Sequence, residues 1–202
     1  MLYDKLINPK GALAALVLSM LLTGSLSVEA ARKKTVQKIK VACVGNSITY
    51  GTGIEDREHF SYPVQLQKML GDKYLVGNFG KPGATLLNHG HRPYMKQEQY
   101  RQAMAFKGDI NDTDPRNWPN YRDEFVKDYL SLMDSLRSAN PKVRFILACM
   151  TPIADRHPRF ISGTKQWHDE IQEAIKVVAR VSGAELIDFH APLYPYPNLL
   201  LD

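Results

Sequence analysis

Short β-branched runs alternate with amphipathic helical stretches along most of this chain, and that alternation limits its fold more than any other feature. The predicted strands are residues 38–44, 74–79, 143–150 and 185–189. Apolar residues at helical spacing predict helices over residues 61–71, 120–139 and 164–181. Such alternation favours parallel strands joined by right-handed crossovers, with helices on both faces. The sequence therefore predicts an α/β fold of three layers, α/β/α, with a doubly wound parallel sheet.

The first 30 residues have the order of a secretory signal peptide. Lys5 and Lys10 precede an apolar run over residues 11–22, and a polar tail leads to the small residue Ala30. A membrane anchor is the alternative, but the run is shorter than the roughly 20 residues that span a bilayer. We expect cleavage near Ala30, an exported mature domain over residues 31–202 in the periplasm or outside the cell, and no stable membrane anchor.

Composition and charge narrow the functional class. Of the 202 residues, 44% are hydrophobic and 23% charged, as in an ordinary globular protein. The formal net charge of +5 is not accompanied by an aromatic and basic stripe, so nucleic-acid binding is not expected. Cys43 and Cys149 each fall inside a predicted buried strand, which favours free thiols over a disulfide.

A serine follows the first predicted strand, at the edge of the sheet where α/β proteins place their active sites. In the segment Gly45-Asn46-Ser47, the Ser47 hydroxyl can be exposed while its backbone N–H points into the same space. An ordinary turn is the alternative for this motif alone. A phosphate-binding loop is disfavoured because no Gly-Lys-Ser/Thr follows.

Two further loops extend the pattern. The segment 78–85 places Gly80 and Gly83 after the second predicted strand, where a backbone must approach something closely. The segment 111–118 begins with Asn111, whose amide could donate a hydrogen bond to a developing oxyanion. A helix cap or turn is the alternative for Asn111.

Together these segments resemble the SGNH (GDSL) hydrolases, and more narrowly the bacterial secreted, sialate O-acetylesterase-like carbohydrate esterases, from about residue 38 to the end. The resemblance implies a flavodoxin-like fold with Ser47 as nucleophile. It also implies an oxyanion hole formed by the N–H groups of Ser47 and Gly83 and the side chain of Asn111. Asn46 stands where the family has aspartate. No metal or organic cofactor is implied.

The chain departs from the family at its C-terminal block, Asp-x-x-His. Asp202 matches the aspartate, and the histidine is expected just beyond it, so the domain over 31–202 is expected to be C-terminally incomplete. His190 has the wrong spacing from Asp188 and is interpreted as a loop residue. His157 and Arg159, which follow the predicted strand 143–150, are predicted substrate-binding residues.

A second departure lies before Asn111, where the family has an apolar central strand. Residues 105–111 leave almost no room for it, so we expect the central third strand to be shortened or missing. Loss of a central strand would cost more than the roughly 5–15 kcal/mol that stabilises a domain.

These features predict a secreted serine ester hydrolase. It would remove a small acyl group, acetyl in the leading hypothesis, from a small-molecule or glycan ester through an acyl-serine intermediate. The alternative is a catalytically dead carbohydrate-binding or remnant protein, because the histidine block is missing. A lipid esterase is a weaker third hypothesis because the loops contain no amphipathic lid. The sequence gives no oligomeric state.

Overall fold

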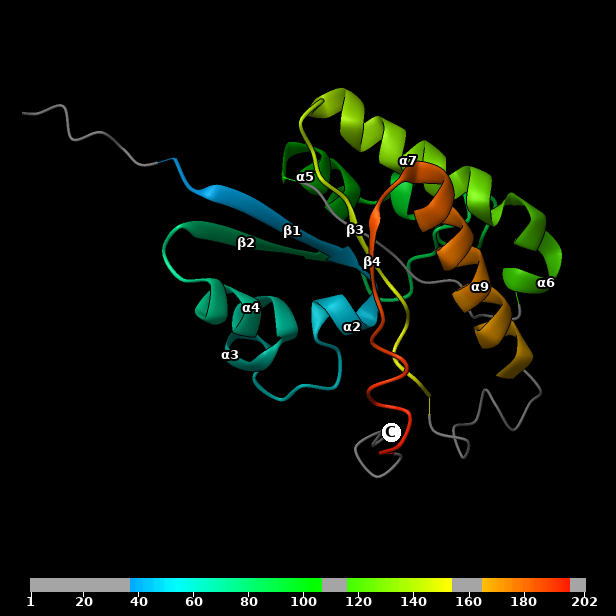
Figure 1. Cartoon of the computed structure of the whole chain (residues 1–202), viewed down its shortest axis with the longest axis horizontal. Helices are drawn as coiled ribbons and strands as arrows, with labels where there is room; N and C mark the ends of the chain where they lie inside the picture. Colours follow the sequence, from blue (N-terminus) through cyan, green and yellow to red (C-terminus); the bar gives the residue numbers. More distant parts are fainter. Residues whose placement is uncertain (1–36, 107–115, 154–164, 197–202) are drawn as a thin grey trace, which may run out of the picture. The chain divides into compact units, whose positions relative to one another are not determined.

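Two pairs of parallel strands form the framework of the fold in the computed structural model, which describes residues 37–106, 116–153 and 165–196 (Figure 1). Strand β1 (Ile39–Gly45) pairs with β2 (Tyr74–Gly80), with Gly45 opposite Gly80 at the carboxyl ends. Strand β3 (Ile146–Ala148) pairs with β4 (Glu185–Ile187). Within these described ranges, no strand bridges the two pairs. The parallel pairing agrees with the sequence prediction.

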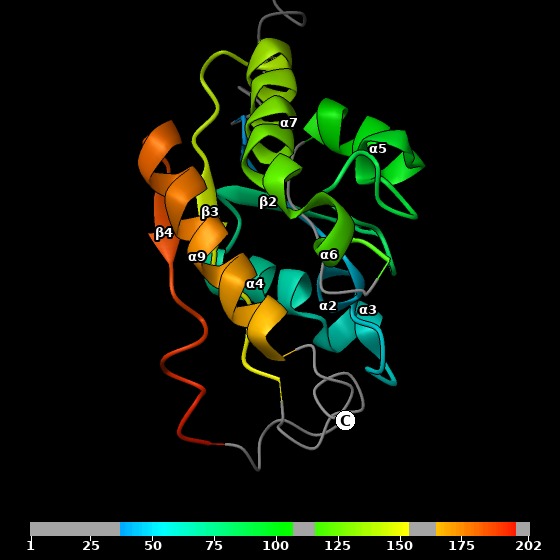
Figure 2. The ribbon, with the colours of Figure 1, turned by 90° about the vertical axis from the view of Figure 1, so that its right-hand side faces the viewer.

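Helices connect and cover the strands. Between β1 and β2 lie α2 (Ser47–Tyr50), α3 (Arg57–Phe60) and α4 (Tyr62–Leu70). The chain from β2 to β3 contains the 3-10 helices η2 (Tyr94–Lys96) and η3 (Arg122–Glu124) and the α-helices α5 (Glu98–Phe106), α6 (Trp118–Tyr121) and α7 (Phe125–Ala139). Helix α9 (Lys165–Ser182) joins β3 to β4. Figures 1 and 2 place α2, α3 and α4 on one side of the β1–β2 pair and α5 and α7 on the other, as the α/β prediction requires.

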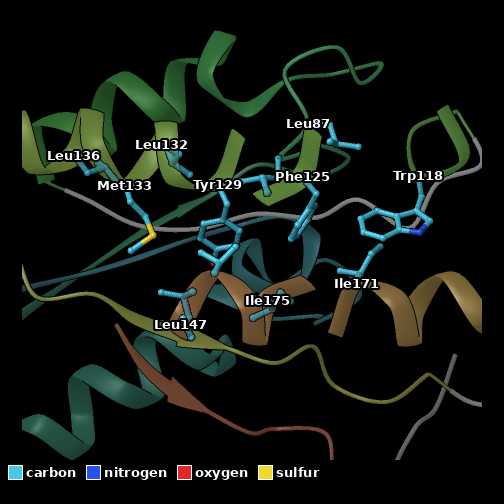
Figure 3. Packing of buried hydrophobic residues seen from close by; sticks show 13 residues of the cluster. Leu87, Trp118, Phe125, Tyr129, Leu132, Met133, Leu136, Leu147, Ile171 and Ile175 are labelled. Carbon is cyan, nitrogen blue, oxygen red and sulfur yellow. The ribbon is translucent and has the colours of Figure 1, made fainter. Parts of the chain in front are cut away.

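The larger hydrophobic core lies between α7, α9 and β3 (Figure 3). Buried side chains recur at helical spacing in both helices and meet Leu147 of β3. Trp118, Phe125 and Tyr129 form a series of edge-to-face ring contacts, with centroids 5.3 and 5.8 Å apart. Most of the apolar residues at helical spacing in 120–139 and 164–181 are buried, and Trp167 and Ala174 of the same predicted face are half-buried. The buried residues are Phe125, Tyr129, Leu132, Met133, Leu136, Ile171, Ile175 and Val178.

A smaller core holds β1 against the chain that follows β2. It contains Val44, Ala84, Tyr94 and Ala103. The Tyr94 ring is fully buried, and its hydroxyl donates to the carbonyl of Phe79 at 2.9 Å. This core fixes the loop after β2 relative to the end of β1.

Several predicted elements differ in extent from those observed. Strand β3 covers only three residues of the predicted 143–150, and all three residues of β4 are exposed. The predicted helix over 120–139 is instead divided into α6, η3 and α7. Pro119, near the start of α6, is compatible only with a first helical turn, which explains a helix start there.

Helix α4 spans the predicted residues but not with the predicted contacts. The helical spacing of the sequence puts Tyr62, Leu66, Met69 and Leu70 on one face, which predicts that this face is buried. Tyr62 and Met69 are instead exposed, and Met69 is 84% accessible. Ser61 occupies the N-cap position, yet its side chain makes no capping hydrogen bond and its Oγ is buried without a partner. Pro63, rather than Tyr62, is the buried residue of this helix.

Two predictions about the organisation of the chain fall on residues that the structure does not describe. The signal peptide over 1–30 is one, and the missing strand before Asn111, within 107–115, is the other. The described chain between β2 and β3 contains no strand, only an isolated bridge between Thr85 and Pro93. No helix in the described residues is long and apolar enough to cross a membrane.

Candidate active site

Ser47 lies at the carboxyl end of β1 as the first residue of α2, and it is half-buried. The preceding residue, Asn46, caps the helix: its Oδ1 accepts a hydrogen bond from the N–H of Ile48 at 2.8 Å. An aspartate at this position would accept the same bond. The substitution of asparagine for the family's aspartate therefore preserves the turn that presents Ser47.

The other end of α2 is also held. Gly51 adopts a left-handed conformation with φ of 90°, and its N–H donates to the carbonyl of Ser47 at 2.9 Å. The Arg57 guanidinium lies 4.0 Å from the centre of the Tyr50 ring and donates to the Tyr50 carbonyl at 3.3 Å. These contacts fix a helix of only four residues.

The loop after β2 meets the loop after β1. The N–H of Lys81 donates to the carbonyl of Gly45 at 2.7 Å, and Gly80 packs directly against α2. Gly83 follows in a left-handed conformation with φ of +72° and is exposed. The structure thus brings together Ser47 and Gly83, two of the predicted catalytic residues, on adjoining loops.

Both predicted oxyanion donors are available. Within the described part of the chain, neither the N–H of Ser47 nor the N–H of Gly83 has a hydrogen-bond partner. Ser47 opens α2, so its N–H precedes the first intrahelical bond. Two unpaired backbone N–H groups on adjoining loops can both donate to a negatively charged oxygen that lies between them.

The segment from Thr85 to Tyr94 is anchored at several points. Thr85 donates its N–H to the Arg92 carbonyl at 2.9 Å and accepts from the N–H of Tyr94 at 2.8 Å. The buried Asp128 carboxylate of α7 accepts from both the backbone and the side-chain nitrogen of Asn88, at 2.7 and 2.9 Å. The loop that carries Gly83 is therefore fixed to both cores.

Asn117, which sequence reasoning did not single out, is fully buried beside this loop. Its Oδ1 accepts hydrogen bonds from the N–H and the Nδ1–H of His91, at 3.0 and 3.2 Å. Arg116 donates to the remaining His91 nitrogen, Nε2, at 3.3 Å. The signal available in the sequence was only that Asn117 belongs to the same polar segment as Asn111.

The remaining predicted site residues lie outside the described residues. They are Asn111, His157, Arg159 and Asp202.

None of the described histidines hydrogen-bonds to Ser47. His59 contacts Asp56, and His89 contacts Glu124 at 2.7 Å. His168 donates to the Thr151 carbonyl at 3.1 Å, and the ring of His190 stacks on Tyr194 at 5.3 Å. Within the described residues, the predicted nucleophile Ser47 therefore has no histidine hydrogen-bonded to it as a general base.

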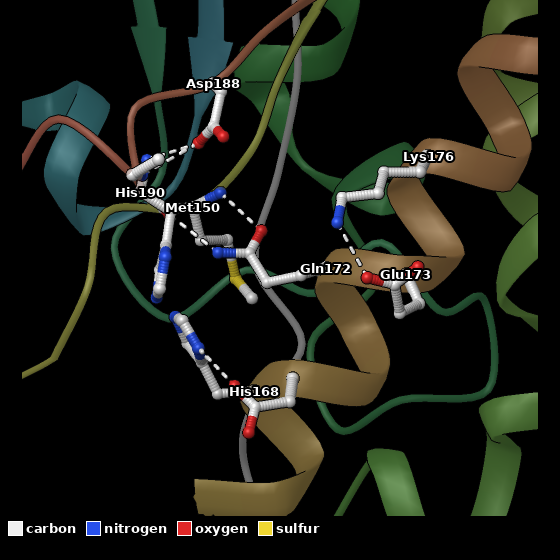
Figure 4. A network of polar contacts seen from close by, with 9 residues as sticks. Met150, His168, Gln172, Glu173, Lys176, Asp188 and His190 are labelled. Carbon is white, nitrogen blue, oxygen red and sulfur yellow. Dashed lines mark hydrogen bonds and ion pairs between the residues drawn. The ribbon is translucent and has the colours of Figure 1, made fainter. Parts of the chain in front are cut away.

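A separate polar cluster lies at the carboxyl ends of β3 and β4 (Figure 4). Gln172 bonds both the N–H and the carbonyl of Met150, at 2.9 and 2.8 Å. Asp188 accepts from the N–H groups of Ala191 and His190, which lowers the pKa of its carboxyl. A shallow cavity of about 230 Å³ opens beside this cluster and is bordered by His190.

Both cysteines are buried free thiols, as predicted. Burial raises the pKa of Cys43 to about 11, although a hydrogen bond from Tyr62 opposes the shift. Burial also raises the pKa of Cys149. A raised pKa disfavours the thiolate, so neither cysteine has the surroundings of an activated nucleophile.

Residues 43–202 match the GDSL-like Lipase/Acylhydrolase family, and the chain belongs to this family. The match begins within β1 and includes Ser47 and Gly83 of the site described above. Among curated proteins, the chain is 39% identical over 176 residues to an acetylxylan esterase of Xylanibacter ruminicola.

That alignment covers 76% of this chain and 36% of the relative, so the chain spans about a third of the length of the relative it matches. Because 76% of 202 residues is about 154, the 176 aligned positions include some that this chain lacks.

Solved structures share the fold. A member of the lipolytic G-D-S-L family from Veillonella parvula superposes with a TM-score of 0.50 at 15% identity, covering 80% of this chain and 83% of that one. A second solved structure gives a TM-score of 0.51 at 16% identity, covering 83% and 87%. These similarities establish the α/β fold of the family.

Proposed function

We propose that this protein removes acetyl groups from a carbohydrate through an acyl-serine intermediate on Ser47. The observation that carries the proposal is the pairing of Ser47 with two unpartnered backbone donors, its own N–H and that of Gly83, on adjoining loops. Membership of an acylhydrolase family and the similarity to an acetylxylan esterase support the same chemistry and a glycan substrate.

In this mechanism, Ser47 Oγ attacks the ester carbonyl carbon and loses its proton to a base. The carbonyl oxygen becomes negatively charged and accepts hydrogen bonds from the N–H groups of Ser47 and Gly83, with Asn111 as the proposed third donor. The sugar oxygen leaves with a proton, and water then attacks the acyl-serine and restores the hydroxyl.

The base is proposed to lie outside the described residues, because each described histidine lacks a contact to Ser47. The proposed base is the histidine that the Asp-x-x-His block predicts after Asp202, with Asp202 orienting it. His157 and Arg159 remain proposed substrate contacts. Export to the periplasm or the medium is proposed from the N-terminal 30 residues, and polymeric glycan substrates lie in those compartments.

A second candidate function is carbohydrate binding without catalysis. The absence of a histidine contact to Ser47 within the described residues favours it. In that case the protein would bind xylan but would not turn over its esters.

The test compares hydrolysis of p-nitrophenyl acetate and acetylated xylan by the wild type, Ser47→Ala and Ser138→Ala. Ser138 is an exposed serine of α7 and serves as the matched control. We expect Ser47→Ala to lower kcat by a factor of about 1,000 or more and Ser138→Ala to have no effect. Folded wild-type protein without Ser47-dependent hydrolysis would contradict the proposal and leave carbohydrate binding as the function.

A further inference from the structure

The guanidinium of Arg92 lies directly over Gly83. A Cβ atom placed on Gly83 would be 3.1 Å from Arg92 Nη1 and 3.8 Å from Arg92 Cζ. Arg92 is also exposed, so the same group that covers the predicted oxyanion donor faces the solvent from which substrate arrives. Arg92 is ten residues from Pro82 in sequence, so only the folded loop creates this contact.

Most of the N–H donors of the Arg92 guanidinium have no hydrogen-bond acceptor among the described residues. Nη1 donates to the carbonyl of Pro82 at 3.0 Å, and within the described residues the guanidinium has no other hydrogen bond and no ion pair. A guanidinium carries five N–H donors, and its Nε and Nη2 edge can bind a carboxylate with two parallel bonds. Lys81, on the same loop, has no ion-pair partner among the described residues either.

The backbone around Arg92 is held in place before any ligand binds. The Arg92 carbonyl accepts from Thr85, and the N–H of the preceding residue, His91, is bonded to the buried Asn117. The following residue, Pro93, is buried. A side chain on so fixed a backbone loses less conformational freedom on binding than one on an unanchored loop.

We propose that Arg92, assisted by Lys81, is a carboxylate-binding subsite beside the acyl-transfer centre, and that the substrate carries a uronic acid next to its acetylated sugar. This inference rests on the proposed esterase function and narrows its substrate class. Two cations without ion-pair partners on the loop that carries Gly83, one of them directly over Gly83, favour an anionic ligand, and the net charge of +5 favours approach of an acidic polymer.

A second role for Arg92 gives a different experimental result. If its charge acted on the oxyanion itself, it would accelerate hydrolysis of every ester alike. A carboxylate-binding role instead changes the preference for acidic over neutral substrates. The ratio of kcat/KM for the two substrates separates these roles.

The experiment uses acetylated xylo-oligosaccharides of equal length, with and without a glucuronic acid branch. We expect Arg92→Gln to lower the acidic-to-neutral ratio of kcat/KM about fivefold, as for an exposed ion pair worth about 1 kcal/mol. Arg92→Lys should retain part of the preference for the acidic substrate. Lysine keeps the positive charge but lacks the planar guanidinium that binds a carboxylate with two parallel hydrogen bonds. Arg101→Gln, an exposed arginine paired with Glu98, is the matched control and should leave the ratio unchanged.

Binding provides a readout that does not depend on turnover. Calorimetry of Ser47→Ala with the deacetylated acidic oligosaccharide should show binding that Arg92→Gln weakens and that salt above about 0.5 M weakens further. If Arg92→Gln lowered kcat/KM equally on the acidic and the neutral substrate, the proposed subsite would be wrong. It would also be wrong if Arg92→Gln left binding of the acidic oligosaccharide unchanged. Arg92-dependent binding without Ser47-dependent hydrolysis would retain the subsite and reject the esterase function.

Discussion

Gly80, the last residue of β2, lies against the backbone of Tyr50, the last residue of α2. A Cβ atom on Gly80 would be 2.2 Å from the Tyr50 nitrogen and 2.6 Å from its Cα. Neither atom can move without moving the helix, because both belong to the backbone. This contact therefore fixes α2, and with it Ser47, on the end of the neighbouring strand.

Replacing Gly80 with alanine should displace α2. Gly80 does not have a left-handed backbone conformation, so alanine adds no backbone strain there. The substitution therefore tests only whether there is room for a Cβ atom. We expect a loss of about 1–3 kcal/mol in the free energy of unfolding, measured by urea denaturation, because the site is overpacked. Ester hydrolysis should fall by about 100-fold as Ser47 shifts by an ångström or so.

Gly53→Ala is the control for this substitution. Gly53 has φ of +86° but no neighbouring atom within 4 Å of a Cβ, so it should cost only about 1 kcal/mol of backbone strain and leave kcat unchanged. Equal activity of Gly80→Ala and wild type would show that α2 does not depend on this contact.

Removing the cap of α2 should have a smaller effect. Asn46→Ala loses the hydrogen bond to the N–H of Ile48, which we expect to cost about 1 kcal/mol and to lower kcat more than it raises KM. Asn46→Asp keeps an acceptor at the same place and should stay within about 0.5 kcal/mol of wild type. Urea denaturation and initial rates on p-nitrophenyl acetate measure both. A destabilised aspartate variant would argue against capping as the role of Asn46.

The two hydrogen bonds of Gln172 should contribute to stability at the carboxyl end of β3. Gln172→Ala leaves the N–H and carbonyl of Met150 without their buried partners, and we expect a loss of about 1–3 kcal/mol. Gln166→Ala, on the exposed face of the same helix, should change the free energy of unfolding by less than about 0.5 kcal/mol. If Gln172→Ala and Gln166→Ala unfolded at the same urea concentration, the hydrogen bonds of Gln172 would not contribute to stability as expected.

The sequence predicted the long, strongly periodic elements and missed the detail of the short ones. Helix α9 was predicted to within a residue or so because its apolar residues repeat over five turns. Strand β4 was predicted two residues too long, since an apolar run does not reveal that its neighbours leave it exposed. The division between α6 and α7 depends on tertiary packing around Trp118, which periodicity does not encode.

The candidate site also has residues that the sequence could predict and residues that it could not. Ser47 and Gly83 could be predicted on adjoining loops because the segments 45–47 and 78–85 each follow a predicted strand and together resemble the blocks of a known family. Arg92 could not, because its position over Gly83 depends on a loop closed by contacts with Thr85 and Asn117. Loop closure of this kind brings together residues whose spacing in sequence carries no signal.

Acid should destabilise the protein through His168. Burial lowers the pKa of this imidazole, with the nearby His190 acting in the same direction, while the Thr151 carbonyl and Asp169 oppose the shift. The folded state therefore favours neutral His168. Its contribution to stability is present above the unfolded pKa of about 6.5 and is lost as the pH falls below that value towards the folded pKa.

We expect the wild type to lose up to about 1.4 kcal/mol per pH unit from this group as the pH falls below 6.5. His168→Gln can still donate to the Thr151 carbonyl but cannot take up a proton, so its free energy of unfolding should fall less steeply. Urea denaturation at pH 5.0, 5.5, 6.0, 6.5 and 7.5 measures the difference in slope. The two proteins should have parallel profiles above pH 7, where the imidazole is neutral in both states. Parallel profiles at acid pH as well would show that the proton uptake comes from another group.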